Sequence, residues 1–298
     1  MHDVQLNKSK DISVALASNS SHYRYAALAY QKKQYLEKFI TTIFIKERDL
    51  YQNFQRINNL LSPRYLKSLD GKLVESLYLS EIRSFFLNRF SNKSQSEIYR
   101  ISNEYFGSQV CRKLEKSSFN IFHFISGLGL ESIDYAKSRG AKIICDQRGT
   151  HFLNEINQIS EEFKNSGKSW SHPENAFFDR LMMEYELSDY IIVNSNYTKK
   201  TFLNAGFCES KVKTLHLGVD TNTFSPSTIK QTDKFKVIFV GTIYPRKGIE
   251  YLLKAWKNLS LPNSELILVG GTDQYFDIKN FSNVKLIEHI PHSKMIHY

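Results

Sequence analysis

Short apolar runs that alternate with helix-like segments are the feature of this sequence that most constrains its fold. The clearest runs are Asn120–Ile125, Ala141–Cys145, Tyr190–Val193, Phe235–Val240 and Glu265–Val269. Polar loops with Gly, Ser or Asn follow these runs, and helical patterns follow the loops. Strands that alternate with helices form βαβ units around a parallel sheet. The sequence therefore predicts an α/β protein.

The N-terminal part of the chain is expected to be less regular. A strand is predicted at Ile12–Leu16, a helix from about His22 to Phe39, and a second strand at Ile40–Ile45. Residues 49–115 show repeated helical spacing, and Pro63 is predicted to open a helix there. Large apolar residues recur along this stretch and indicate helices that pack them into a core: Leu69, Leu73, Leu77, Ile82, Phe85 and Phe86.

The length of 298 residues suggests two domains. The boundary is expected at residues 225–234, which are rich in Ser, Thr and Lys and poor in strand formers. Such a composition is typical of a linker. We therefore expect an N-terminal Rossmann-like domain with a helical insertion over residues 1–224 and a C-terminal one over residues 235–298.

Composition argues against several classes of protein. Hydrophobic residues make up 41% of the chain and charged residues 23%, which is typical of a globular protein and argues against wholesale disorder. The three cysteines, Cys111, Cys145 and Cys208, are far apart. Neither a disulfide framework nor a zinc cluster is therefore expected, and a reducing cytoplasm is the expected compartment. The N-terminal residues lack the apolar core of a signal peptide, and no apolar run reaches the roughly 20 residues of a spanning helix.

The net charge of +10 favours anionic partners, such as a nucleoside diphosphate, a phospholipid surface or a nucleic acid. Solubility alone explains the charge equally well. Nucleic-acid binding would involve the helices between Tyr23 and Arg112, which are rich in Tyr and Lys. Their aromatic residues fall at helical spacing, which favours core packing, so no nucleic-acid partner is expected.

The loops that follow the predicted strands are the candidate sites, because ligands of open parallel sheets bind beyond the carboxyl ends of the strands. One loop runs from Gly241 through Thr242, Arg246 and Lys247 to Gly248. Gly241 allows a sharp turn, and the helix that opens at Lys247 and Gly248 presents N–H groups and positive potential to a phosphate. A solvated basic pair at the start of a helix is the alternative.

A second loop runs from Asp146 through Arg148 to His151, directly after a predicted strand. An imidazole at this place could accept a proton from a substrate hydroxyl or donate a hydrogen bond to a sugar. A structural histidine is the alternative. In a third loop, Gly218 permits a tight bend or close approach of a ligand. Ser195, which follows the predicted strand Tyr190–Val193, is predicted to cap a helix.

The loops, taken in their order, resemble those of retaining glycosyltransferases of family 4 between about residue 119 and residue 269. The resemblance rests on Glu184–Pro226, on Val240–Ala255 with its Arg-Lys-Gly-Ile run, on Glu265–Gly270 and on Cys145–Phe163. It implies a GT-B fold, in which two Rossmann-like domains face each other across a cleft and the second binds a nucleotide sugar. It also implies sugar transfer with retention and without a required metal or other cofactor, the nucleotide-diphosphate sugar being the co-substrate.

The resemblance also implies roles for single residues. Lys247, with Arg246 beside it, would contact the donor diphosphate, Gly241 would lie beneath the nucleotide, and His151 would be the active-site histidine. Thr242 stands where many members carry Arg, so one phosphate contact would be either missing or supplied by Arg246. Other residues would line the acceptor side or the cleft: Ser18, Asn19, Asp146, Arg148, Ser195 and Gly218.

The sequence also departs from the family. Ser18–Ser21 stands where many members have a glycine pair, and the family's two donor-binding glutamates would lie beyond Tyr298. The second domain is therefore expected to be truncated and transfer to be impaired. The alternative is a non-catalytic fragment or a binding protein that a partner chain completes. The expected acceptor is a glycan or a lipid-linked molecule, and peripheral contact of the basic, aromatic helices with the inner face of a membrane is a further alternative.

Overall fold

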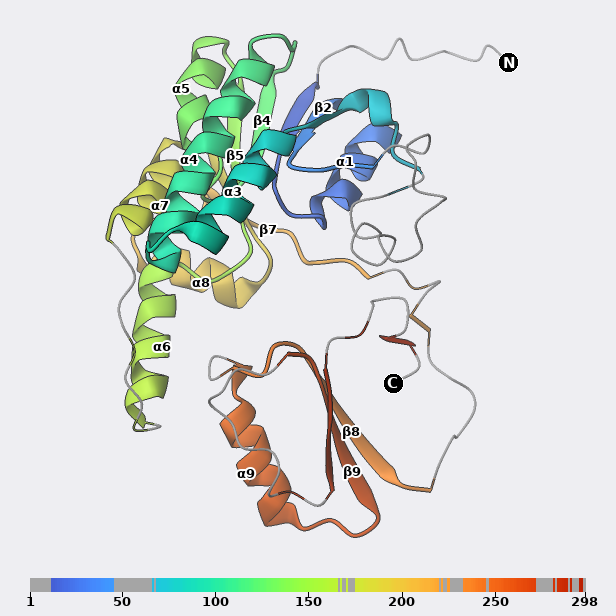
Figure 1. Ribbon diagram of the computed structural model, residues 1–298. Coiled ribbons are helices and arrows are strands. Elements are labelled where there is room, and N and C mark those ends of the chain that lie inside the picture. Colours follow the sequence, from blue (N-terminus) through green and yellow to red (C-terminus); the bar gives the residue numbers. More distant parts are fainter. Residues whose placement is uncertain are drawn as a thin grey trace. The chain divides into compact units, whose positions relative to one another are not determined.

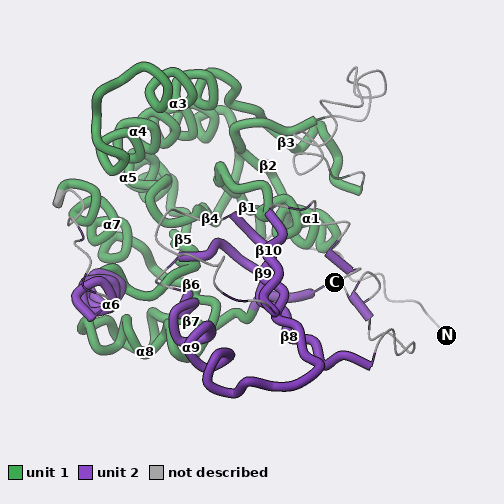
Figure 2. The backbone as a smooth tube through the Cα atoms, turned by 60° about the horizontal axis from the view of Figure 1, so that its bottom comes forward, with its two compact units in different colours: residues 1–152, 172–216 green, residues 153–171, 217–298 purple. Residues whose placement is uncertain are grey.

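A computed structural model describes residues 12–45, 66, 68–165, 167, 170, 175–219, 221, 224–225, 233–244, 247–271, 281, 283–288, 290 and 295–296. The chain divides into two compact units (Figure 2). Unit 1 comprises Met1–Phe152 and His172–His216, and unit 2 comprises Leu153–Ser171 and Leu217–Tyr298. Pro63 and most of the expected linker at 225–234 lie outside the described residues. The predicted helix start and linker therefore stay predictions.

Unit 1 is built on a seven-stranded sheet in the order β3-β2-β1-β4-β5-β6-β7. Every pair of neighbouring strands is parallel, so the carboxyl ends of all seven strands meet at one edge. The strand order reverses between β1 and β4, which is where ligands bind in open sheets of this kind. The strands are β1 (Val14–Ala17), β2 (Leu36–Thr41), β3 (Val74–Ser76), β4 (Ile121–Ile125), β5 (Lys142–Gln147), β6 (Tyr190–Val193) and β7 (Val212–Thr214).

Helices supply the core on both faces of this sheet (Figure 1). Successive residues of a strand point to opposite faces, so Ala15 and Ala17 pack in one core and Leu16 in the other. The first core also contains residues of α4 (Gln95–Leu114), α5 (Leu130–Ser138), α7 (Asn175–Leu187) and α8 (Asn196–Asn204). The second contains Tyr23 and Ala27 of α1 (Tyr23–Lys32).

The predicted boundary between the first helix and the second strand is wrong. The helix ends at Lys32 and not at Phe39, because Gln34 adopts a positive φ of 61° and Tyr35 N–H donates to the carbonyl of Tyr30. Strand β2 then begins at Leu36, four residues before the predicted start. No Gly or Pro marks the turn, and the helical spacing of apolar residues continues past it. The predicted helix was therefore too long.

The stretch expected to be helical up to residue 115 also contains a strand. The short 3-10 helix η3 (Gly71–Leu73) leads into β3, which pairs with β2 at the edge of the sheet. Helix α3 (Tyr78–Phe90) follows, and here the expected core packing of Ile82, Phe85 and Phe86 is wrong. Their side chains are 50%, 62% and 54% exposed, whereas Leu69 and Leu77 are buried as expected.

Unit 2 contains a three-stranded parallel sheet in the order β10-β9-β8. Its elements are β8 (Phe235–Val240), α9 (Ile249–Leu259), β9 (Ser264–Val269), β10 (Val284–Ile287) and, from Leu153 on, α6 (Phe152–Asn165). One face of α9 packs on the sheet through Leu253 and Trp256. The hydroxyl of Tyr251 on α9 donates to the carboxylate of Glu162 on α6 at 3.0 Å. Both units thus confirm the expected α/β class with parallel sheets.

Gly129 provides a test of the packing at the start of α5. A Cβ at this position would lie 2.3 Å from Cδ2 of Phe124, a fully buried ring of β4. We expect Gly129→Ala to lower the free energy of unfolding by about 1–3 kcal/mol, because the core must move to accept the methyl group. Urea denaturation measures this change. Gly218→Ala is the matched control, because a Cβ there meets nothing within 4 Å; equal losses in both variants would contradict the packing argument.

Candidate functional site

A buried carboxylate holds an arginine at the carboxyl edge of the seven-stranded sheet. Asp146, near the end of β5, is 4% exposed. Arg148 donates to both of its oxygens, from Nε at 3.0 Å and from Nη2 at 3.1 Å. This bidentate geometry fixes the plane of the guanidinium group. Asp146 and Arg148, which were predicted to lie in one candidate loop, are therefore in direct contact in the structure.

Three further side chains extend this contact into a chain of polar groups. Tyr23 of α1 bonds to Nε of Arg148 at 3.0 Å, and its ring lies beneath the guanidinium, 4.7 Å from the ring centre to Cζ. His123 of β4 lies on the other side, with Nε2 3.5 Å from Oδ2 of Asp146. The hydroxyl of Tyr30 reaches Nδ1 of His123 at 2.9 Å. Residues of α1, β4 and β5 thus meet next to the point where the strand order reverses.

The electrostatics of this row of polar side chains keep Asp146 ionised. Burial opposes ionisation, but His123, Arg148 and Tyr23 outweigh it and hold the pKa of Asp146 below its usual value. Burial and the charge of Asp146 raise the pKa of Tyr30 to about 12 and that of Tyr23 further. The tyrosines therefore stay neutral, and the Arg148 side chain, 36% exposed, is left as a fixed cation at the sheet edge. Such a group suits a phosphate, a carboxylate or a sugar hydroxyl.

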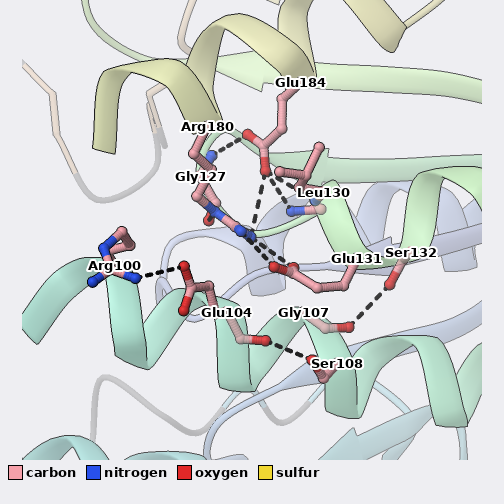
Figure 3. Close-up of polar contacts among 11 residues, drawn as sticks. Arg100, Glu104, Gly107, Ser108, Gly127, Leu130, Glu131, Ser132, Arg180 and Glu184 are labelled. Carbon is pink, nitrogen blue, oxygen red and sulfur yellow. Dashed lines mark hydrogen bonds and ion pairs between the residues drawn. The ribbon is translucent and has the colours of Figure 1, made fainter. Parts of the chain in front are cut away.

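A second buried charge organises the connection from β4 to α5. Glu184 of α7 is fully buried, and its carboxylate accepts hydrogen bonds from the backbone N–H groups of Gly127, Gly129 and Leu130 (Figure 3). The N–H groups of Gly129 and Leu130 belong to the N-terminal end of α5, where helices favour an anion, and that of Gly127 lies in the loop just before it. The anion position of this helix is thus filled by the protein's own side chain.

Arg180, one turn before Glu184 on α7, completes this arrangement. It donates to the carbonyl of Gly127 at 2.9 Å and to both carboxylate oxygens of Glu131. Gly107 of α4 leaves room for Glu131, because a Cβ there would be 1.9 Å from its Oε2. Burial raises the pKa of Glu184 to about 7, although Arg180 and the three N–H donors act in the opposite direction. The cluster therefore holds α4, α5 and α7 together.

His151, predicted as the catalytic residue, lies in the core. Its side chain is 1% exposed, and aromatic rings surround it: Phe152, Tyr185, Phe202 and Phe207. Its backbone N–H donates to Thr201 at 2.9 Å. Burial lowers the pKa of the imidazole to about 4, so the ring is neutral at pH 7. The structure thus places His151 against α8, among these rings.

The remaining residues predicted for the acceptor side have local roles. Ser18 is fully buried and accepts from the N–H of Ser20, while Asn19 is exposed. Ser195 caps α8, as predicted, by accepting from the N–H of Thr198 at 3.0 Å. Gly218, in unit 2, is exposed and has open space where a Cβ would be, so sterics do not require glycine there.

In unit 2, two glycines bring the ends of β8 and β9 close together. Gly241 and Gly270 have φ angles of +146° and +147°, which side chains rarely allow. A Cβ at Gly270 would lie 2.0 Å from the carbonyl oxygen of Gly241. The N–H of Ile243 then donates to Gly271 at 2.9 Å, so the loop continues beside β9 before it turns.

This loop ends at the N-terminus of α9. Gly248 occupies the N-cap position with φ +70° and has no side chain to cap the helix. Among the described residues, the backbone N–H groups of Ile249 and Tyr251 have no acceptor. Lys247 and Thr242 are exposed, whereas Arg246 lies outside the described residues. A lysine next to a helix N-terminus at the carboxyl end of a strand suits a phosphate group.

A hollow in unit 2 lies at the other end of these elements. Its volume is about 440 Å³, and its lining includes Lys234, Trp256, Lys257 and Asn263. Lys234 and Asn263 lie just before β8 and β9, and Trp256 and Lys257 lie in the last turns of α9. The hollow therefore lies away from the carboxyl edge, where ligands of parallel sheets bind. Among the described residues, no group of three or more His, Cys, Asp or Glu could hold a metal ion.

Four residues of these clusters were not predicted from the sequence: Tyr23, His123, Arg180 and Glu184. A signal existed for His123, which stands in the middle of the apolar run Ile121–Ile125. Another existed for Arg180 and Glu184, which are spaced i, i+4 on α7, so both face the same side of that helix. Tyr23 gave no signal, because only the fold brings α1 beside the loop after β5.

Comparison with known proteins places one family in unit 2. Residues 220–294 match the family model of glycosyl transferases group 1. This segment contains the Gly241–Gly248 loop, α9 and all three strands of the second sheet. No curated protein sequence matches the chain.

Solved structures extend the likeness to the fold of nearly the whole chain. The catalytic domain of starch synthase IV from Arabidopsis thaliana, bound to ADP and acarbose, has a TM-score of 0.55 at 13% identity; the match covers 95% of this chain and 75% of that one. A structure titled trehalose-6-phosphate from E. coli, bound with UDP-2-fluoro glucose, has a TM-score of 0.50 at 10% identity, covering 94% and 74%. The likeness confirms the expected GT-B class of fold.

The raised pKa of Glu184 predicts a pH-dependent stability. The folded carboxyl releases its proton near pH 7 and the unfolded one near 4.5, so the folded state binds more protons between these values. The free energy of unfolding should therefore fall as pH rises from about 4.5 to about 7, by up to about 3 kcal/mol. Urea denaturation of wild type and Glu184→Gln at several pH values measures this contribution. The variant lacks the titrating carboxyl group, so its stability should lose this part of the pH dependence. Glu186→Gln, an exposed site on α7, is the control; an unchanged pH profile in Glu184→Gln would contradict the prediction.

The lowered pKa of His151 predicts the opposite slope. Its folded pKa of about 4 lies below the ordinary 6.5, so the unfolded state binds more protons between them. Stability should rise with pH across this window, and His151→Asn should remove the rise, by about 3 kcal/mol at most. Thermal unfolding from pH 4 to pH 7 measures it. A variant that keeps the wild-type profile but loses catalytic activity would instead favour the catalytic assignment.

Proposed function

We propose that this protein transfers a sugar from a nucleotide-diphosphate sugar to an acceptor hydroxyl. The observation that carries the proposal is the loop from Gly241 to Lys247, which leads into the glycine-capped N-terminus of α9. The match of residues 220–294 to glycosyl transferases group 1 supports it, because it covers this loop. The two similar structures, one bound to ADP and the other to UDP-2-fluoro glucose, support a nucleotide ligand.

The chemistry of the donor explains why this loop suits it. When the bond between the sugar and the diphosphate breaks, negative charge develops on the departing phosphate oxygen. N–H groups at a helix N-terminus and a neighbouring ammonium group stabilise such a charge without rearrangement. In our proposal, Lys247 and the first turn of α9 supply these groups, with Arg246 as a further cation. The donor is a hexosyl nucleotide, and transfer proceeds with retention and without a required metal, as the resemblance to family 4 implies.

The acceptor side is proposed for the carboxyl edge of the seven-stranded sheet. Arg148 is the exposed end of the chain of contacts through Asp146, Tyr23 and His123, so its guanidinium is fixed before a ligand arrives. Preorganised donors bind without further loss of side-chain entropy. We propose that Arg148 binds hydroxyl or phosphate groups of a glycan or lipid-linked acceptor. No proton transfer is assigned to His151, since its ring is buried.

Binding of a nucleotide sugar without transfer is the second candidate function. The burial of His151 favours it, because the predicted acid–base group is removed from solvent. Radiolabelled UDP-, ADP- and GDP-sugars, offered with glycan and lipid-linked acceptors, separate the two functions. Labelled product supports the transferase, whereas nucleotide binding without product supports the binding protein.

Lys247 provides the direct test of the donor site. We expect Lys247→Ala to weaken the binding of UDP, ADP or GDP roughly 10- to 100-fold, which is the value of one charge-assisted contact. Isothermal titration calorimetry measures the affinity. Lys254→Ala replaces an exposed lysine within α9; it is the matched control and should leave the affinity unchanged. Lys257→Ala reports on the hollow at the far end of α9; if it alone weakens binding, the donor site is not at Lys247.

A further inference from the structure

The outer side of helix α3 is apolar, although a surface helix normally turns its apolar side chains to the core and its polar ones to water. Six large side chains along α3 are 50–70% exposed: Tyr78, Leu79, Ile82, Phe85, Phe86 and Phe90. At about 100° per residue they fall within an arc of roughly 140°. They therefore form one continuous surface, which we call the α3 face.

The opposite side of α3 packs on unit 1 through small polar residues. Ser80 is buried, and the hydroxyl groups of Ser84 and of Ser102 on α4 lie 3.4 Å apart. Figures 1 and 2 both show α3 beside α4 on the outside of unit 1. No hydrophobic core of the described residues includes a residue of the α3 face. No helix in the described part of the chain is long and apolar enough to cross a membrane.

The area of the α3 face is close to what a stable dimer buries on each copy. At roughly 200 Å² for a whole aromatic side chain and somewhat less for Leu and Ile, the six exposed fractions add up to about 700 Å². A standard protein interface buries about 800 Å² on each partner, whereas the largest apolar patch of an ordinary monomer is about 300–600 Å². The α3 face is thus larger than a monomer ordinarily exposes.

Two charged residues make the α3 face complementary to itself. Glu81 stands four residues before Phe85, and Arg89 stands four residues after it. When two copies of α3 pack antiparallel around a two-fold axis at Phe85, Arg89 of each copy is level with Glu81 of the other. Within its own chain Arg89 lies over Phe90, its Cζ 5.7 Å from the ring centre, and pairs with no described carboxylate. Glu81 has contacts within its own chain, but the lone pairs of a carboxylate accept more than one donor.

The same antiparallel register also brings the apolar side chains together. With a rise of about 1.5 Å per residue, Phe90 of one copy lies about 7.5 Å from the axis, between Leu79 and Ile82 of the other copy. Phe85 and Phe86 meet their own counterparts near the axis, and such aromatic pairs contribute beyond the area that they bury. A parallel pairing would instead place Arg89 against Arg89. The order of residues along α3 therefore favours the antiparallel pair.

We propose that this protein forms a symmetric dimer through α3, with the two helices antiparallel around a two-fold axis at Phe85. The apolar side chains of the α3 face form the buried centre of the interface, and two ion pairs between Arg89 and Glu81 set its register. The net charge of +10 does not oppose this contact strongly, because the excess is spread along the chain and salt screens exposed charges beyond about 8 Å.

The dimer does not depend on the proposed sugar transfer. It involves α3 of unit 1, whereas the donor site is built from the second sheet and α9. Loss of the dimer and loss of nucleotide binding are therefore separate measurements, and each can fail without the other.

Light scattering of the full chain after size exclusion, over a concentration series up to about 100 μM, tests the proposal. We expect a species of twice the chain mass of 34.7 kDa. Phe85→Ser with Phe86→Ser should raise the dissociation constant about 100-fold or more, because the exposed rings of both copies are lost from the interface. A wild-type chain that stays monomeric at every concentration would overturn the proposal, and flotation of that monomer with phosphatidylglycerol vesicles would assign the α3 face to lipid instead.

Charge reversal tests the register of the dimer. Arg89→Glu alone and Glu81→Arg alone should each weaken the dimer about tenfold or more, because each brings like charges together at both ends of the interface. The double variant exchanges the two charges, so its dissociation constant should return to within about threefold of the wild-type value. A double variant that is as weak as the single ones would contradict the antiparallel pairing and with it the proposed dimer.

Two control variants separate loss of the dimer from loss of the fold. Tyr197→Ser removes an aromatic side chain of α8 that is 56% exposed, and Arg139→Glu reverses an exposed arginine at the end of α5. Both should dimerise as wild type does. Thermal midpoints of all variants should agree at concentrations low enough for monomers, since none of the substituted residues is buried. Dimers that the controls and the phenylalanine variant weaken equally would overturn the proposal.

Discussion

The carboxylate of Glu184, buried against the first turn of α5, is the constraint on which the first unit depends. Three backbone N–H groups donate to it, and Arg180 beside it donates to Gly127 and to Glu131. Removal of a buried acceptor of this kind leaves its donors without partners, which costs more than the hydrogen bonds themselves contribute. The loop after β4 therefore keeps one conformation beside the carboxyl edge of the sheet, where the Asp146–Arg148 pair lies.

Glu184 also makes the N-terminus of α5 different from that of α9, although the two resemble each other in sequence. Helices α5 and α9 both have glycine at the N-cap and both follow a parallel strand. In α5 an internal carboxylate satisfies the N–H groups, whereas in α9 the N–H groups of Ile249 and Tyr251 have no acceptor among the described residues. Lys247 adds a positive charge only at the second. Electrostatics thus favour an external phosphate at α9, and this contrast, together with the family match over residues 220–294, supports the proposed donor site.

The strand positions and the α/β class could be predicted from the sequence, because buried parallel strands leave continuous apolar runs. The strands from β4 onward follow the predictions closely, and Ser195 caps α8 as expected. The start of β2 could not be predicted, since the turn at Gln34 depends on a positive φ in a residue other than glycine. Nor could the orientation of α3: its spacing showed that Ile82, Phe85 and Phe86 share a face, but not which way that face points.

The sequence by itself determined the order of strands and helices and the placement of polar loops after the strands, because local periodicity and loop composition carry that information. Only the tertiary structure decided which polar residues meet. Tyr23 reaches Arg148 from 125 residues away, Glu184 reaches α5, and His151 lies among aromatic rings. The physical reason is that burial and charge compensation depend on long-range neighbours, so the environment of a titratable group is a property of the fold and not of the residues beside it in the chain.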